Sequence, residues 1–361
     1  MLENCRWLLY VSRFSGCHPL TLDERSTFTR FQQLLMYSCV TGGVYCFGTF
    51  YANYPVNCIA QSKMIVGCPL RRIARYNRGL YLITTLLLSC LRHEKFELAL
   101  AAARKFDDSI HHRSYADNIR TNRYTQWLVI SAICASWFLV GTLGQLALRN
   151  VFVISNIVQI TMRVMFSVEI AKFCFLYDAL CRRFRYLNGL CQELTGDSVS
   201  RMYTKRFTVS SLERLHRHLT DATNHLNSYY SPQLLCWTAC ILIDIVAFSF
   251  TVLYAENTVM QVCLQIIIIL LLSLQLIAIS RYSDLTCNQA NAFAMTLYSV
   301  EDKRSMFENT ETSFEAIELG IFLRAHPLRV NVCGLFNLSS QFTCSAFGVI
   351  LMYVILASSI H

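Results

Sequence analysis

Residues 341–360 read QFTCSAFGVILMYVILASSI and contain no Asp, Glu, Lys or Arg. An α-helix needs about 20 apolar residues to cross the hydrocarbon of a bilayer, so this run is long enough to form a transmembrane helix. Three other stretches meet the same criterion easily, at residues 31–53, 127–148 and 259–280. The sequence therefore predicts a membrane protein with several helical spans.

Three weaker stretches complete a predicted set of seven spans: residues 79–91, 150–177 and 233–254. The first is short and flanked by arginines, which can reach the membrane interface with their long side chains. The other two carry charged residues. No Pro-, Gly- or Ser-rich linker divides the chain. We therefore expect the fold class to be all-α, with one seven-helix membrane domain over residues 1–361.

The composition agrees with a polytopic membrane protein. Charged residues make up 15% of the chain, against about 25% in ordinary soluble domains. The net charge of +9 is better explained by the basic loops that orient membrane proteins than by binding to nucleic acid. The 17 cysteines are scattered and form no C-x-x-C pair, which disfavours a zinc or redox site. We expect no metal and no cofactor.

The distribution of Lys and Arg predicts the orientation in the membrane. The segment before the first span and the loops after the second, fourth and sixth spans together carry 24 of them, whereas the opposite side carries six. Cytoplasmic loops are the basic ones, so the N-terminus is expected in the cytoplasm and the C-terminus outside. Cys58 and Cys68 share the one sizeable outside loop, where a disulfide between them is chemically possible.

The long inside loops carry helical hydrophobic patterns. One heptad stripe consists of Leu212, Leu215, Leu219, Ala222, Leu226 and Tyr229, and a second of Phe96, Leu100, Ala103, Phe106 and Ile110. Such faces must pack against each other or against another subunit, and the pattern leaves both possibilities open. We expect a cytoplasmic helical base in which Leu212, Leu215, Leu219 and Leu226 are candidate oligomer contacts.

Polar residues within the spans are candidate ligand contacts. Asp244 lies in the middle of a predicted span, where an unpaired acid is costly, so it is expected to face the protein interior. It would contact a ligand or ion there, or pair with Arg163 or Lys172. Glu169 and Lys172 are three residues apart and suited to pair with each other. The other candidates are Tyr81, Gln145, Asn156, Gln159, Gln261 and Gln265, for which interhelical hydrogen bonds are the alternative.

Two other functions are compatible with parts of the sequence. His112 and Asp117 have the His-x4-Asp spacing of some membrane acyltransferases, in which the His acts as a base, but no glycine-rich acceptor-binding segment follows. A G-protein-coupled receptor also has seven spans, but it requires the opposite orientation. The histidines at positions 111, 112, 216 and 218 lack an accompanying acid or Cys framework, so we expect them to be solvated on basic loops rather than to bind metal.

The segment before the last span carries a recognisable motif. Residues 333–336 read CGLF, and Tyr353 lies within the span. This pattern resembles the insect gustatory receptors, whose last helix follows a Cys-Gly-x-Phe element and ends in Thr-Tyr, five mostly apolar residues and Gln-Phe. Cys333, Gly334 and Phe336 match the first element. In the second element only Tyr353 matches, because Met352, Ser359 and Ile360 replace the Thr, Gln and Phe.

The resemblance implies a function. Gustatory receptors are similar to the insect odorant receptors in being homo- or heterotetrameric ligand-gated cation channels of sensory neurons. The last helix of each subunit lines a central pore, the inner ends of the later helices form a base where subunits meet, and ligands enter a pocket in the outer half of the bundle. The resemblance therefore implies a plasma-membrane receptor for bitter-type or other small organic tastants that conducts cations and contacts lipid. Its implied pore or gate residues are Tyr353, Ser358, Ser359 and Ile360.

Overall fold

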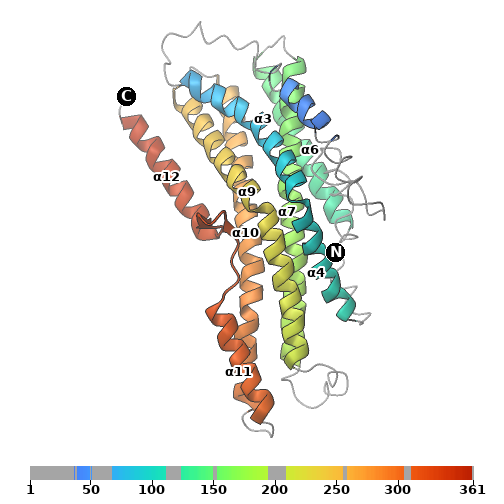
Figure 1. Cartoon of the computed structure of the whole chain (residues 1–361). Coiled ribbons are helices and arrows are strands. Elements are labelled where there is room, and N and C mark those ends of the chain that lie inside the picture. Colours follow the sequence, from blue (N-terminus) through green and yellow to red (C-terminus); the bar gives the residue numbers. More distant parts are fainter. Residues whose placement is uncertain are drawn as a thin grey trace.

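The computed structural model describes residues 36, 39–48, 50, 67–110, 123–148, 153–193, 209–254, 258–304 and 310–359. Within these residues the chain is almost entirely helical (Figure 1), which confirms the all-α fold class. The helices are α3 (Gly67–Leu91), α4 (His93–Ser109), α6 (Arg123–Leu148), α7 (Val153–Glu193), α9 (Val209–Tyr254), α10 (Val259–Arg304), α11 (Thr310–Ala325) and α12 (Ser340–Ser359). The strands β1 (Asn331–Val332) and β2 (Phe336–Asn337) form an antiparallel hairpin.

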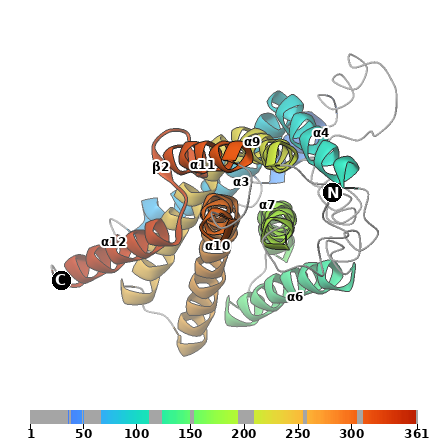
Figure 2. The ribbon, with the colours of Figure 1, turned by 90° about the horizontal axis from the view of Figure 1, so that it is seen from below.

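Three long helices form the axis of the molecule. α7 has 41 residues, and α9 and α10 have 46 each. At 1.5 Å per residue they are about 60–70 Å long, roughly twice the hydrocarbon thickness of a bilayer. Their lower halves pack with α4 and α11, and we call this part the base. α3, α6 and α12 surround their upper halves (Figures 1 and 2).

The apolar stretches predicted from the sequence lie in helices wherever they are described. By length and hydropathy, the helical segments able to span a membrane among the described residues are Tyr124–Leu146, Ser210–Leu253 and Val259–Leu297. Shorter apolar helical segments are Cys39–Gly48, Gly79–Leu91 and Ser340–Leu356. The remaining predicted stretch, residues 150–177, falls mostly in α7. The count of seven spans and their orientation stay predictions.

Two helices extend beyond the predicted apolar stretches. α3 begins at Gly67, before the stretch 79–91, so the arginines at positions 71, 72, 75 and 78 belong to the helix. Pro69 lies in the first turn, where proline is tolerated because its missing N–H has no helical partner. α7 continues to Glu193. Cys58 and the side chain of Cys68, between which a disulfide is chemically possible, lie outside the described residues.

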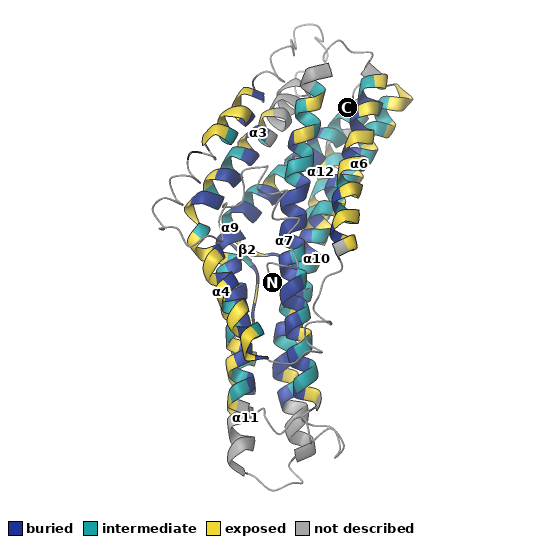
Figure 3. Ribbon diagram, turned by 90° about the vertical axis from the view of Figure 1, so that its right-hand side faces the viewer, coloured by how far each residue is buried: buried dark blue, intermediate teal, exposed yellow. Residues whose placement is uncertain are grey.

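The base has a continuous core within the single chain. Leu212, Leu215, Leu219 and Leu226 are each at most 3% exposed. All five apolar residues of the stripe on α4 are also buried, and the ring centroids of Phe96 and Tyr229 lie 5.1 Å apart. Figure 3 shows this buried surface along the facing sides of the helices. The leucine stripe therefore has its packing partners within its own subunit.

His216 is buried in this core and not solvated as predicted. It lies four residues after Leu212, so it shares the buried face of α9. Its Nε2 atom is 3.3 Å from the carbonyl oxygen of Ala290, and its ring stacks on Phe293 with centroids 4.7 Å apart. His216 precedes the stretch predicted to cross the membrane, residues 233–254. Burial lowers the pKa of His216 from 6.5 to about 4, which keeps the ring neutral at physiological pH.

Candidate functional site

A small, partly open cavity lies in the upper half of the molecule. Its lining residues come from five helices and are Tyr81, Trp137, Met162, Arg163, Phe166, Cys240, Ile241, Asp244 and Leu272. Its volume is about 20 Å³, room for about one water molecule, so a larger ligand has to push its walls apart. Most of the wall is apolar or aromatic, and the polar groups are few. This combination is typical of a site that recognises a compact, mainly apolar ligand.

Two charged side chains meet this apolar wall. The guanidinium carbon of Arg163 lies 4.8 Å from the ring centroid of Trp137 and 5.4 Å from that of Phe248. Both rings are close enough to stabilise the cation through their negative π-faces. Asp244 contributes an acid from α9 and is only 6% exposed. The lining of the cavity therefore has one positive and one negative group, and no net charge.

The structure brings two of the predicted ligand residues to this cavity. Tyr81 and Asp244 line it, and the ring of Tyr81 packs edge-on against Phe166 with centroids 4.1 Å apart. Asn156 instead donates to the carbonyl oxygen of Gly141 at 3.0 Å. Gln261 caps α10 through reciprocal bonds with Thr258. Gln145, Gln159 and Gln265 are half-buried on α6, α7 and α10.

Sequence reasoning missed most of the cavity lining. Arg163 was considered only as a partner for Asp244. The apolar lining residues are Trp137, Met162, Phe166, Cys240, Ile241 and Leu272. In a transmembrane span, apolar residues are found on every face, so their identity carries no signal of a cavity. Only the two charged residues, Arg163 and Asp244, stand out from the apolar sequence of these spans.

A polar cluster lies one turn further along α7. The hydroxyl of Ser167 accepts hydrogen bonds from Trp137 Nε1 at 2.7 Å and from Gln275 Nε2 at 2.8 Å. It therefore joins α6, α7 and α10 beside the cavity. Next to it, the predicted pair of Glu169 and Lys172 is confirmed. Their charged atoms are 2.5 Å apart and both side chains are buried, so each provides the other's countercharge.

The motif of Cys333, Gly334 and Phe336 forms the turn of the hairpin. Cys333 and Gly334 have φ values of 52° and 76°, and Leu335 N–H donates to Val332 O at 2.9 Å. A tight hairpin turn of this kind needs positive φ at both central residues, which glycine adopts without strain. The ring of Phe336 stacks on Phe342 at 4.3 Å. The motif residues therefore shape the segment that leads into α12.

Hydrogen bonds tie this segment and the start of α12 to the long helices. The side chain of Asn291 binds both the N–H and the carbonyl oxygen of Leu328, at 2.8 and 3.1 Å. Ser340 N–H donates to Asp284 at 2.5 Å. The hydroxyls of Ser280 and Thr343 are also hydrogen-bonded. The amino end of the last helix is thus held by α10.

The rest of α12 leans away from the bundle (Figures 1 and 2). Met352 is 72% exposed and Tyr353 is 51% exposed, although the ring of Tyr353 lies 5.8 Å from that of Phe250 on α9. An apolar face this open requires lipid or another protein chain to cover it. Ser358 and Ser359 belong to the last turn of α12, but their side chains and Ile360 lie outside the described residues.

Comparisons with known proteins agree with this architecture. A family model described as 7tm Chemosensory receptor matches residues 5–356. The insect olfactory receptor OR5 from Machilis hrabei, solved in complex with eugenol, has a TM-score of 0.75 and 14% identity, with 99% of this chain and 97% of that chain covered. A second structure of OR5 gives 0.67 and 15% over the same coverage. At this identity the likeness shows the fold. A comparison with curated proteins finds no match.

Proposed function

The chain belongs to the 7tm chemosensory receptor family, and we propose that it is a subunit of a tetrameric, ligand-gated, non-selective cation channel that detects small organic tastants. The family and the fold identify a multi-pass membrane receptor and not an enzyme. The acyltransferase alternative is therefore set aside, and its residues His112 and Asp117 lie outside the described part of the chain. The likeness in fold to an insect olfactory receptor also disfavours a G-protein-coupled receptor.

The observation that carries the proposal is the small cavity with Arg163 and Asp244 in its wall. A ligand with a net charge would leave one charge uncompensated in apolar surroundings, at a high desolvation cost. A neutral ligand can donate a hydrogen bond to Asp244 and accept one from Arg163 while its body packs on the aromatic rings. The preferred ligand is therefore a compact, neutral, largely aromatic molecule with both a donor and an acceptor. Bitter-type compounds include molecules of this kind.

The conducting part of the proposed channel is α12. Four copies around a central axis, in a homo- or heterotetramer, would bring their last turns together. Hydroxyls of Ser358 and Ser359 then replace part of the hydration shell of a permeating cation, and a ring of Ile360 closes the pore by dewetting. Tyr353 lies further down the same helix. This arrangement belongs in the plasma membrane of a sensory neuron, with the N-terminus in the cytoplasm.

The proposal is tested by recording calcium entry in cells that express the chain alone or with other receptor subunits. The compounds are neutral aromatic molecules that carry a donor and an acceptor, with eugenol included as a first probe. Asp244→Asn and Arg163→Met are expected to weaken the response at least tenfold in effective concentration. Asp178→Asn is the matched control, because Asp178 pairs with Arg182 at the surface of α7. Responses that both cavity variants leave unchanged would remove the cavity from ligand recognition.

A further inference from the structure

Helix α9 continues through Pro232, but it loses one helical hydrogen bond there, and we call this position the break. Proline has no backbone N–H, so the carbonyl oxygen of Ser228, four residues earlier, loses its helical donor. Arg92 supplies a replacement, because its Nη1 atom donates to that oxygen at 2.5 Å. Arg92 is itself the single residue between the end of α3 and the start of α4. Two helix breaks therefore lie at the same level and are joined by one hydrogen bond.

Above this level, α3 and α9 are tied together at three successive turns. Asn77 and Cys240 exchange hydrogen bonds at 3.4 and 3.0 Å. Nε1 of Trp237 donates to the hydroxyl of Thr85 at 3.5 Å. The side-chain amide of Gln233 donates to Ser89 at 3.1 Å. These bonds connect residues 77–91 and 233–254 into one unit, which we call the upper pair. Both of its helices line the cavity.

At the break itself, Ser231 holds the hairpin that precedes α12. Its hydroxyl donates to the carbonyl oxygen of Asn331 at 3.0 Å and accepts from the backbone N–H of Cys333 at 2.6 Å. Ser231 immediately precedes Pro232 in the sequence. The same short segment of α9 therefore contacts the α3–α4 junction on one side and the start of the last helix on the other.

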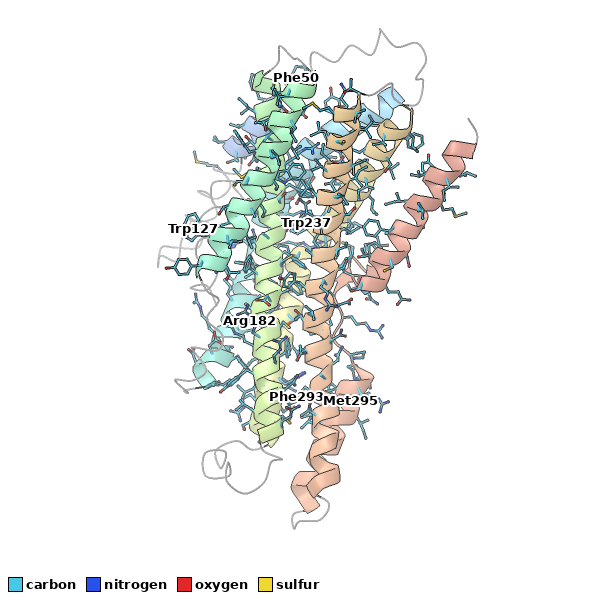
Figure 4. The ribbon with its side chains drawn as sticks, turned by 180° about the vertical axis from the view of Figure 1, so that it is seen from behind. Phe50, Trp127, Arg182, Trp237, Phe293 and Met295 are labelled. Atoms are coloured by element: carbon cyan, nitrogen blue, oxygen red, sulfur yellow. The ribbon has the colours of Figure 1, made fainter. Side chains whose placement is uncertain are left out.

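Buried aromatic rings cross the break without a gap. The ring of Tyr81, in the cavity wall, lies 6.2 Å from that of Trp237, and Trp237 lies 5.8 Å from Tyr230, on the other side of Pro232. Phe173 of α7 packs edge-on against both Trp237 and Tyr230. Figure 4 shows Trp237 near the middle of the molecule. Close-packed rings have no free space to absorb a displacement, so they pass it on.

We propose that Arg92 and Ser231 are positioning residues of a joint at Pro232, which transmits occupancy of the cavity to the last helix. The inference rests on the proposed function of the cavity and of α12. A ligand displaces the wall formed by Tyr81 and Ile241, and the upper pair turns as a unit. The turn occurs at Arg92 and Pro232 because α3 ends just before Arg92 and Pro232 removes one helical hydrogen bond from α9, so bending costs least there. Ser231 then moves the hairpin and with it the amino end of α12.

The test uses the full chain in lipid nanodiscs and a probe that needs no known ligand. Ile241→Trp fills the cavity with a side chain, and Leu272→Phe is a second filling variant in case the first does not fold. Hydrogen exchange is read by mass spectrometry at the backbone N–H groups of Leu335 and Leu338, whose hydrogen bonds do not involve Ser231. Filling the cavity is expected to change their exchange rate about fivefold or more, as for typical coupled sites.

The double variants decide whether the joint carries this effect. In the background of Ser231→Ala, cavity filling is expected to leave hairpin exchange unchanged, and Ser231→Thr, which keeps the hydroxyl, is expected to restore the change. Ser228→Ala is the matched control, because it keeps the carbonyl oxygen that Arg92 binds. The proposed joint would be overturned if the effects of cavity filling and of Ser231→Ala on hairpin exchange simply add. It would also be overturned if cavity filling leaves the exchange rate unchanged. Current recorded from the same variants tests the proposed function separately, since exchange coupling without any current refutes the channel and keeps the joint.

Discussion

The base and the upper half differ in how completely they are packed within one chain (Figure 3). In the base, Leu212 and Leu219 are 2% and 0% exposed, and Arg183 forms two hydrogen bonds with Asp107, at 2.9 and 2.7 Å. In the upper half, Val349 and Met352 are 68% and 72% exposed. The single chain therefore buries the apolar stripes of its base, although Ile321 and Phe322 of α11 remain 55% and 58% exposed. Its upper half depends on surroundings that cover a larger apolar surface.

We propose that this difference arises from the solvent that each half meets, with the base in water and the upper half in lipid. A base in water has to bury its apolar stripes and pair its charges inside, which favours close helix contacts along heptad patterns. Helices in lipid gain little from burying apolar side chains, because lipid is equally apolar. The upper half can therefore keep a leaning helix whose apolar face is not covered within the chain. Moving parts are expected above the joint and stable packing below it.

The largest expected effect comes from a charge placed in the base. Leu219→Asp puts a carboxylate into a fully buried position, and we expect it to abolish folded protein, because an unpaired charge there costs more than about 4 kcal/mol. Leu98→Asp is the control, since Leu98 is 40% exposed on α4. Size-exclusion chromatography in detergent gives the result. A folded, monodisperse monomer of Leu219→Asp would mean that the stripe serves contacts between subunits and not the core of its own chain.

Two neighbouring arginines provide the next comparison. Arg183→Met removes the partner of Asp107 from a site where the Arg side chain is 2% exposed, and we expect a loss of about 3 kcal/mol in the free energy of unfolding. Arg182→Met removes a half-exposed pair with Asp178, and its loss is expected to stay below about 1 kcal/mol. Thermal melting in detergent compares the two variants. Equal shifts in melting temperature would contradict the distinction between buried and surface pairs.

A close contact between α6 and α7 tests the packing of the upper half. A Cβ atom on Gly141 would meet two atoms of Ile160, one of them Cγ1 at 2.7 Å, whereas one on Gly144 would lie 3.6 Å from Leu264. Gly141→Ala is therefore expected to separate the helices and cost about 2 kcal/mol, and Gly144→Ala to be tolerated. Melting curves measure both variants. The double variant Gly141→Ala/Ile160→Val should recover part of the loss if Ile160 is the obstacle.

The two halves also differed in how far the sequence predicted them. The stripes of the base and the Glu169–Lys172 pair follow helical spacing along one helix, so local pattern was enough to find them. The cavity draws Trp137, Met162 and Leu272 from three different helices, and nothing in an apolar span shows which side faces a neighbour. The contacts of Arg92 with Ser228 and of Arg183 with Asp107 join distant parts of the chain, which no local pattern predicts.

The wrong prediction that His216 is solvated has a different cause. The basic surroundings suggested a solvated loop, although its position four residues after Leu212 already placed it on the buried face of a helical stripe. Charge composition describes a segment as a whole, whereas burial depends on the face that a residue occupies. In the base the helical period was therefore the better guide.

The smallest expected effect is a pH dependence of the base through His216. The pKa of this residue is about 4 in the fold and about 6.5 in the unfolded chain, so the unfolded state binds more protons between these values. The stabilising contribution is fully present above pH 6.5 and is lost as the pH falls toward 4. Between pH 7.5 and 5.5 the loss is about 1 kcal/mol. His216→Phe keeps a ring against Phe293 and removes the titration, so its melting temperature should fall less over this range. If the melting temperatures of the unmodified protein and of His216→Phe fall in parallel with pH, the pH dependence belongs to other groups.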